Sequence, residues 1–143
     1  MEGKTLRVLS LDLGEKRIGV AVSDPTGTIV TPVNAIVRKD SEEKDVKSVL
    51  ELVTLYGPGT IVIGLPITLS GRLGQTARLV QDFISALSLK SSVPIVPQDE
   101  RFSTVEAERL LREGGHVPSR EKGLRDSASA AIILQSYLDR QGN

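Results

Sequence analysis

The chain has 143 residues, of which 39% are hydrophobic and 25% charged, and this composition is typical of a single globular domain. It contains no apolar run that could span a membrane, and its first residues lack the apolar region of a signal peptide, so we expect a cytoplasmic protein. The absence of cysteine excludes disulfides and thiolate metal sites, and the single histidine, His116, excludes a zinc site built from several histidines. A metal site here would use oxygen ligands, which suit Mg²⁺, Mn²⁺ or Ca²⁺.

The charges of the chain balance, with 18 basic and 18 acidic residues. Nucleic-acid-binding proteins often carry a basic excess, so only a local basic patch would support that function. Aromatic residues make up only 3% of the chain, which argues against binding dominated by base stacking and favours recognition of backbone and shape.

The first third of the chain predicts an antiparallel meander. Apolar and β-branched residues indicate strands over Leu6–Leu13, Arg17–Ser23 and Thr28–Val37, and a Pro-Thr-Gly turn signal separates the second from the third. Pro32 cannot donate to a sheet ladder, so it predicts an edge position or a bulge for the third strand.

The hydrophobic period then changes to that of helices alternating with strands. A helix is expected after Ser41 and up to Gly57, and others at about 75–87, from 103 to 114 and at about 124–139. Strands are expected at 60–64 and 93–97. The resulting order, βββ-α-β-α-β-α-α, predicts an α/β fold: one domain over residues 1–143, with a mixed five-stranded sheet flanked by helices.

Three carboxylates lie at the ends of predicted elements. Asp12 is near the end of an apolar strand, where an unpaired carboxylate costs several kcal/mol. Glu100 follows the fifth strand, and Asp126 is placed in the first turn of the last helix. If the first and fifth strands are parallel neighbours, Asp12 and Glu100 meet at one edge of the sheet.

Converging carboxylates are the ligands that Mg²⁺ prefers, and two such ions about 3.5–4 Å apart can activate water and stabilise the leaving oxygen of a phosphodiester. Simpler interpretations exist for two of the acids, since Asp126 could cap its helix and Glu100 could pair with Arg101. Asp99 is an alternative to Glu100, because successive residues of an extended segment point to opposite faces.

Four ordered blocks of sequence resemble the YqgF/RuvX family, known as pre-16S rRNA nucleases or Holliday junction resolvase-like proteins. The resemblance covers nearly the whole chain, and the blocks are Leu11–Asp24, Ile63–Pro66 with Gly71 and Gly74, Asp99–Thr104 with Glu106 and Ala107, and Lys122–Ala128 with Ile133–Leu138. It implies a ribonuclease H-like fold and a metal-dependent nuclease acting on the 5′ end of the 16S rRNA precursor. It also implies Asp12, Glu100 and Asp126 as metal-binding and catalytic acids, with Mg²⁺ or Mn²⁺ as the cofactor.

The chain departs from related junction resolvases at one position. Those enzymes carry two acids three residues apart on the last helix, whereas here Ser129 follows Asp126 at that spacing. A second metal ion would therefore lose a carboxylate ligand, unless water or Ser129 replaces it.

Basic residues neighbour each of the three acids and predict a rim that grips phosphates. The candidates for this nucleic-acid contact are Lys16, Arg17, Arg72, Arg101, Lys122 and Arg125. The glycine-rich loop from Gly64 to Gly74 could also bring backbone N–H groups near a phosphate, or it could be a simple connector.

Several functions remain open on the sequence alone. The leading hypothesis is an endonuclease of structured nucleic acid, most simply precursor rRNA, in a monomer or weak homodimer. Holliday junction resolution would use the same acids, and a non-catalytic RNA-binding assembly factor would have a vestigial acid cluster. The Asp12–Gly14 segment also resembles the phosphate loop of actin- and hexokinase-type ATPases, but 143 residues suffice for only one of their two domains.

Overall fold

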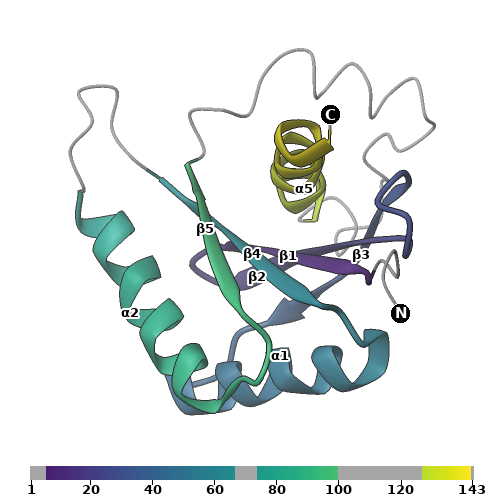
Figure 1. The fold of residues 1–143 in the computed structure, drawn as a ribbon. Helices are drawn as coiled ribbons and strands as arrows, with labels where there is room; N and C mark the ends of the chain where they lie inside the picture. Colours follow the sequence, from purple (N-terminus) through teal and green to yellow (C-terminus); the bar gives the residue numbers. More distant parts are fainter. Residues whose placement is uncertain (1–5, 67–73, 100–126, 143) are drawn as a thin grey trace.

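The computed structural model describes residues 6–66, 74–99 and 127–142. In this part of the chain, five strands form one mixed sheet with three helices packed against it (Figure 1). The elements are β1 (Val8–Leu13), β2 (Arg17–Ser23), β3 (Val30–Val37), α1 (Glu42–Tyr56), β4 (Thr60–Leu65), α2 (Gln75–Lys90), β5 (Ile95–Asp99) and α5 (Ala128–Gly142).

The sheet has the strand order β3-β2-β1-β4-β5, which confirms the predicted α/β architecture. The strands β1, β2 and β3 form the antiparallel meander, and β4 and β5 run parallel to β1. The expected helix over 103–114 lies outside the described residues, as do residues 124–126 of the last predicted helix.

β1 and β5 do not meet the condition of being neighbours, because β4 lies between them. One side of β1 is taken by β2, so β4 pairs with the other side and β5 adds outside β4. Since all three strands are parallel, the carboxyl ends of β1 and β5 still lie at the same edge of the sheet, two strand spacings or about 10 Å apart.

The two faces of the sheet are covered by different helices. Leu9 and Leu11 of β1 pack with Val49 of α1 and Phe83 of α2 in the larger core. Ser10 points to the opposite face, where its hydroxyl donates a 2.7 Å hydrogen bond to the carbonyl of Ala130 in α5. Figure 1 shows the same arrangement, with α5 on one side of the sheet and α1 and α2 on the other.

The signals read for helix α1 are confirmed. The hydroxyl of Ser41 accepts from the Lys44 N–H and caps the helix at its start. At its end, Gly57 adopts a left-handed conformation with φ of 60°, which glycine reaches without strain. None of the helices in the described part of the chain is long and apolar enough to cross a membrane.

The edge strand β3 contains the predicted irregularity. Its register against β2 shifts between Ile18 and Val20, beside Pro32, so that one extra residue of β3 bulges. The hydroxyl of Ser127, immediately before α5, accepts from the Val20 N–H at 3.0 Å and donates to the carbonyl of Val33. This buried side chain therefore bridges β2 and β3 at the bulge and fixes the start of α5 on the sheet.

We predict that Ser127→Ala lowers the free energy of unfolding by about 1–3 kcal/mol, because it leaves the buried Val20 N–H without a partner. Chemical denaturation measures this change. Ser136→Ala is the matched control, since Ser136 in α5 is also buried but its hydroxyl has no hydrogen-bond partner among the described residues. If both variants lost the same stability, the bridging role of Ser127 would be wrong.

Candidate active site

Asp12 lies at the end of β1, on the sheet face that α5 covers. It is two residues from Ser10, so the two side chains share a face, while Leu11 between them enters the opposite core. Its partner across the ladder is Gly19 of β2, which brings no side chain to this position. The carboxylate therefore reaches the surface where the sheet emerges from beneath the start of α5.

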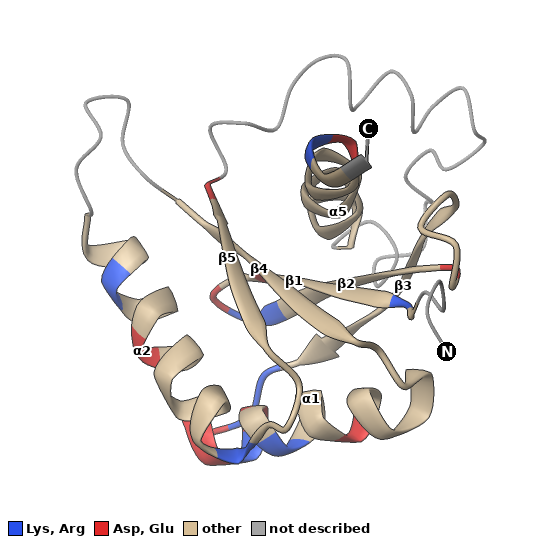
Figure 2. Cartoon of the chain, viewed as in Figure 1, with Lys and Arg blue, Asp and Glu red and all other residues tan. Residues whose placement is uncertain are grey.

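A hollow of about 320 Å³ surrounds this carboxylate. Its lining is mainly polar and combines the end of β1, the turn into β2 and the first turn of α5, namely Asp12, Gly14, Glu15, Lys16, Arg17, Gly19 and Ser129. Figure 2 shows acidic and basic positions next to each other in the turn between β1 and β2. Three residues singled out from the sequence, Asp12, Lys16 and Arg17, are thus brought together.

Burial raises the pKa of the Asp12 carboxyl above its ordinary value of 3.8. Among the described residues, nothing donates a hydrogen bond to this carboxylate or forms an ion pair with it. A partly desolvated carboxylate without a protein partner favours an external cation. Although Lys16 and Arg17 line the same hollow, neither forms an ion pair with Asp12 in this structure.

Asp99, the alternative ligand, belongs to the other face of the sheet. It pairs in register with Leu65, which lies in the core formed with α1 and α2. In a parallel ladder, paired residues point to the same side, so the Asp99 side chain leaves the sheet on the face opposite to Asp12. This placement argues against Asp99 as a partner of Asp12.

A second polar group on the Asp12 face escaped the sequence reasoning. Gln98 pairs with Gly64 of β4, one residue out of phase with Asp99, and is 7% exposed. Within the part of the chain that the structure describes, its amide nitrogen has no hydrogen-bond partner. A glutamine in a short strand carries no sequence signal of such a position.

The other predicted site residues lie outside the described part of the chain. These are Glu100 and Asp126 among the acids, together with Arg72, Arg101, Lys122 and Arg125. Within residues 6–66, 74–99 and 127–142, no three acidic or histidine side chains gather as a metal site. Among the described residues, the hollow is lined by the carboxylates of Asp12 and Glu15, of which only Asp12 was predicted as a ligand, and by the hydroxyl of Ser129.

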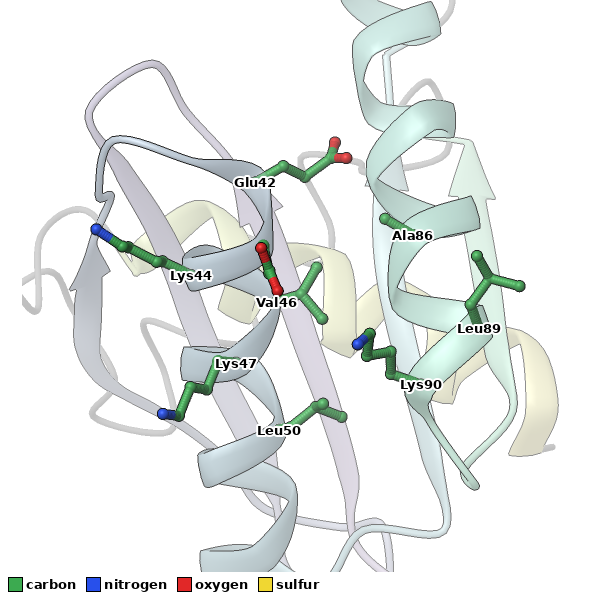
Figure 3. A pocket seen from close by; sticks show the side chains of 9 residues that line it. Glu42, Lys44, Val46, Lys47, Leu50, Ala86, Leu89 and Lys90 are labelled. Carbon is green, nitrogen blue, oxygen red and sulfur yellow. The ribbon is translucent and has the colours of Figure 1, made fainter.

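A larger hollow of about 610 Å³ lies between α1 and α2, on the far face of the sheet (Figure 3). Val46, Leu50 and Ala86 provide apolar side chains, while charged residues such as Lys44 and Lys90 also line it. It offers no unpaired buried acid and no arrangement suited to hydrolysis, so the smaller hollow at Asp12 is the candidate active site.

The sequence matches a known protein family over most of its length. The family model described as "RuvX: Holliday junction resolvase" matches residues 6–140. The chain belongs to the RuvX family. It is 41% identical over 137 residues to a protein of Pelotomaculum thermopropionicum named "Putative pre-16S rRNA nuclease", covering 96% of this chain and 89% of the relative. Family membership confirms the resemblance read from the four sequence blocks and the assignment as a phosphodiester hydrolase of the nuclease class.

Solved structures of the same fold are more distant in sequence. RuvC of Thermus thermophilus in complex with a Holliday junction substrate aligns with a TM-score of 0.64 at 15% identity, covering 96% of this chain and 97% of that one. The ROK hexokinase of Thermus thermophilus aligns with a TM-score of 0.50 at 21% identity, and the alignment covers 74% of this chain but 38% of the hexokinase. At these identities the likeness shows the fold alone, and it confirms the ribonuclease H-like architecture.

The pKa of Asp12 predicts how the metal-free protein responds to pH. Because folding raises this pKa, the folded state binds the proton of Asp12 more tightly than the unfolded chain does. Protonation of Asp12 therefore stabilises the folded state, and this stabilisation is fully present only below pH 3.8, the ordinary pKa. It is lost as pH rises through the folded pKa. Asp12→Asn removes the free-energy cost of burying the charged carboxylate. We therefore expect the variant to be more stable than the wild type at pH 7 in EDTA, and this difference in stability to disappear below pH 3.8.

Urea denaturation at both pH values measures this gap, with Asp82→Asn, an exposed carboxylate on α2, as the control. A wild type that is more stable than Asp12→Asn at pH 7 without metal would show that Asp12 already has a stabilising partner in the protein.

Proposed function

We propose that this protein is a Mg²⁺- or Mn²⁺-dependent endonuclease that processes the 5′ end of the 16S rRNA precursor in the cytoplasm. The observation that carries the proposal is Asp12, a partly desolvated carboxylate without a described partner, in a polar hollow next to Lys16 and Arg17. The name shared by relatives of about 40% identity supports rRNA as the substrate.

The donor chemistry of the hollow fits a hard divalent cation. Asp12 and Ser129 offer a carboxylate and a hydroxyl, the oxygen ligands that Mg²⁺ and Mn²⁺ accept. We assign Glu100 and Asp126 as the further carboxylate ligands. Glu100 and Asp99 were the two alternatives for this ligand, and the position of Asp99 on the opposite face argues against Asp99 and so supports Glu100.

Each group would have a distinct role in phosphodiester hydrolysis. When bound, the metal ion supplies an acidified water and charge neutralisation at the phosphate. Asp12 anchors the site on the rigid end of β1, while Lys16 and Arg17 hold the phosphate of the substrate above it. Arg72, Arg101, Lys122 and Arg125 extend this basic contact along the RNA. We expect a monomer or weak homodimer to suffice for this reaction.

Asp12→Asn tests the assignment, and we expect it to lower the cleavage rate by at least about 100-fold, since even loss of a residue that only hydrogen-bonds to a metal ligand costs about 10–100-fold. Asp82→Asn on α2 should cleave at the wild-type rate. Thermal unfolding gives a second readout, because saturating Mn²⁺ stabilises only a protein that binds it, by about 2.7 kcal/mol at 100 times Kd. The wild type should gain this stabilisation and Asp12→Asn should not.

Holliday junction resolution is the second candidate function, favoured by the description of the family model. Purified protein offered a four-way DNA junction and a precursor rRNA fragment in parallel separates the two, and we expect faster cleavage of the RNA. If neither substrate is cleaved but the RNA is bound by both the wild type and Asp12→Asn, the protein is instead a non-catalytic assembly factor.

A further inference from the structure

The backbone of the turn that carries Lys16 and Arg17 is held in one conformation. The N–H of Gly14 donates to the carbonyl of Arg17 at 2.9 Å, which closes the turn. A Cβ atom at Gly14 would lie 2.8 Å from that same carbonyl oxygen, so any larger residue would force the backbone apart. The positions of both basic residues beside Asp12 therefore depend on this backbone.

Arg38, the first residue after β3, holds the turn from outside the hollow. One terminal nitrogen of its guanidinium donates to the carbonyl of Gly14 at 2.8 Å, and its backbone N–H donates to the carbonyl of Lys16 at 2.9 Å. Two carbonyl oxygens of the turn are thereby bound by a single residue. The Gly14 carbonyl is thus directed toward the guanidinium and the Lys16 carbonyl toward a backbone N–H, and neither is left to repel a phosphate.

Asp45 in the first turn of α1 fixes the orientation of Arg38. Its carboxylate accepts from the Arg38 Nε at 3.0 Å and from the Lys39 N–H at 2.8 Å. Asp45 is only 1% exposed, and the helix N-terminus is a favourable place for its charge. A buried carboxylate with two donors on different groups leaves the guanidinium little freedom, so α1 is linked through Arg38 to the turn.

We propose that Arg38 and Asp45 are positioning residues that hold the Gly14–Arg17 turn so that its basic side chains can bind substrate phosphates beside Asp12. This inference rests on the proposed nuclease function. Lysine cannot replace Arg38, because its single ammonium lacks the planar fork that reaches Asp45 and Gly14 together. Neither residue is expected to touch the substrate itself.

A double-mutant cycle on RNA binding tests this role. A fluorescein-labelled RNA hairpin is titrated in EDTA with the wild type, Arg38→Lys, the double variant Lys16→Met/Arg17→Met, and the triple variant. We expect Arg38→Lys to weaken binding about tenfold and to reduce the salt slope of log K by about 1, the loss of one phosphate contact. In the Lys16→Met/Arg17→Met background, Arg38→Lys should have no further effect.

Two further variants provide a second test and a matched control. Asp45→Asn should weaken binding in the same direction, and Lys47→Met, which removes an exposed charge from α1, should bind as the wild type does. In steady-state cleavage with Mg²⁺, Arg38→Lys should raise KM and leave kcat nearly unchanged, whereas a general loss of folded protein would lower the apparent kcat without changing KM.

The inference is overturned if Arg38→Lys binds as the wild type does, or if it weakens binding equally in both backgrounds, which would mean direct contact with RNA. A wild type that binds the hairpin but does not cleave it contradicts only the catalytic proposal. A wild type that does not bind it contradicts the proposed function and this inference together. Faster amide exchange at residues 14–17 in Arg38→Lys would then show that Arg38 has a structural role alone.

Discussion

The docking of α5 on the sheet is the constraint on which the rest of the site depends. Ser127 inserts its hydroxyl into the bulge between β2 and β3, and Ser10 ties β1 to the carbonyl of Ala130 one turn further along. These two buried polar contacts fix the helix along and across the sheet. Because the first turn of α5 is fixed above the end of β1, Ser129 and Asp12 line the same hollow.

The same packing explains the unusual state of Asp12. A carboxylate at the end of a central strand loses hydration to the helix and the neighbouring strands, and the raised pKa is the consequence. The protein supplies no described partner that would recover this cost. An uncompensated desolvation cost of this kind is expected at a functional site, where a polar group is left to bind a ligand rather than paired within the fold.

Much of the fold was predictable because its signals are local. The Asp24–Gly27 turn, the Ser41 cap, the Gly57 stop and the edge position of Pro32 each depend on neighbouring residues, and the structure confirms them. The partly buried position of Asp12 near the end of β1 was also predictable, because a charged residue stands out in an apolar strand.

Long-range features were not predictable. Arg38 and Gly14 are 24 residues apart, and an acid in a first helical turn, such as Asp45, resembles an ordinary partner of the helix dipole. Ser127 was read as part of a helix rather than as the bridge at a bulge. The place of β4 between β1 and β5 likewise depends on which side of β1 was already occupied. Such contacts are set by topology and have no local signature.

The central claim is that Asp12 is a ligand of the catalytic divalent cation. Anomalous diffraction from crystals of the wild type soaked in Mn²⁺ tests it most directly. We predict an anomalous peak about 2.0–2.6 Å from a carboxylate oxygen of Asp12, the range over which hard divalent cations bind oxygen. An ordered Mn²⁺ bound elsewhere in an enzyme that cleaves RNA, with Asp12 not among its ligands, would contradict it.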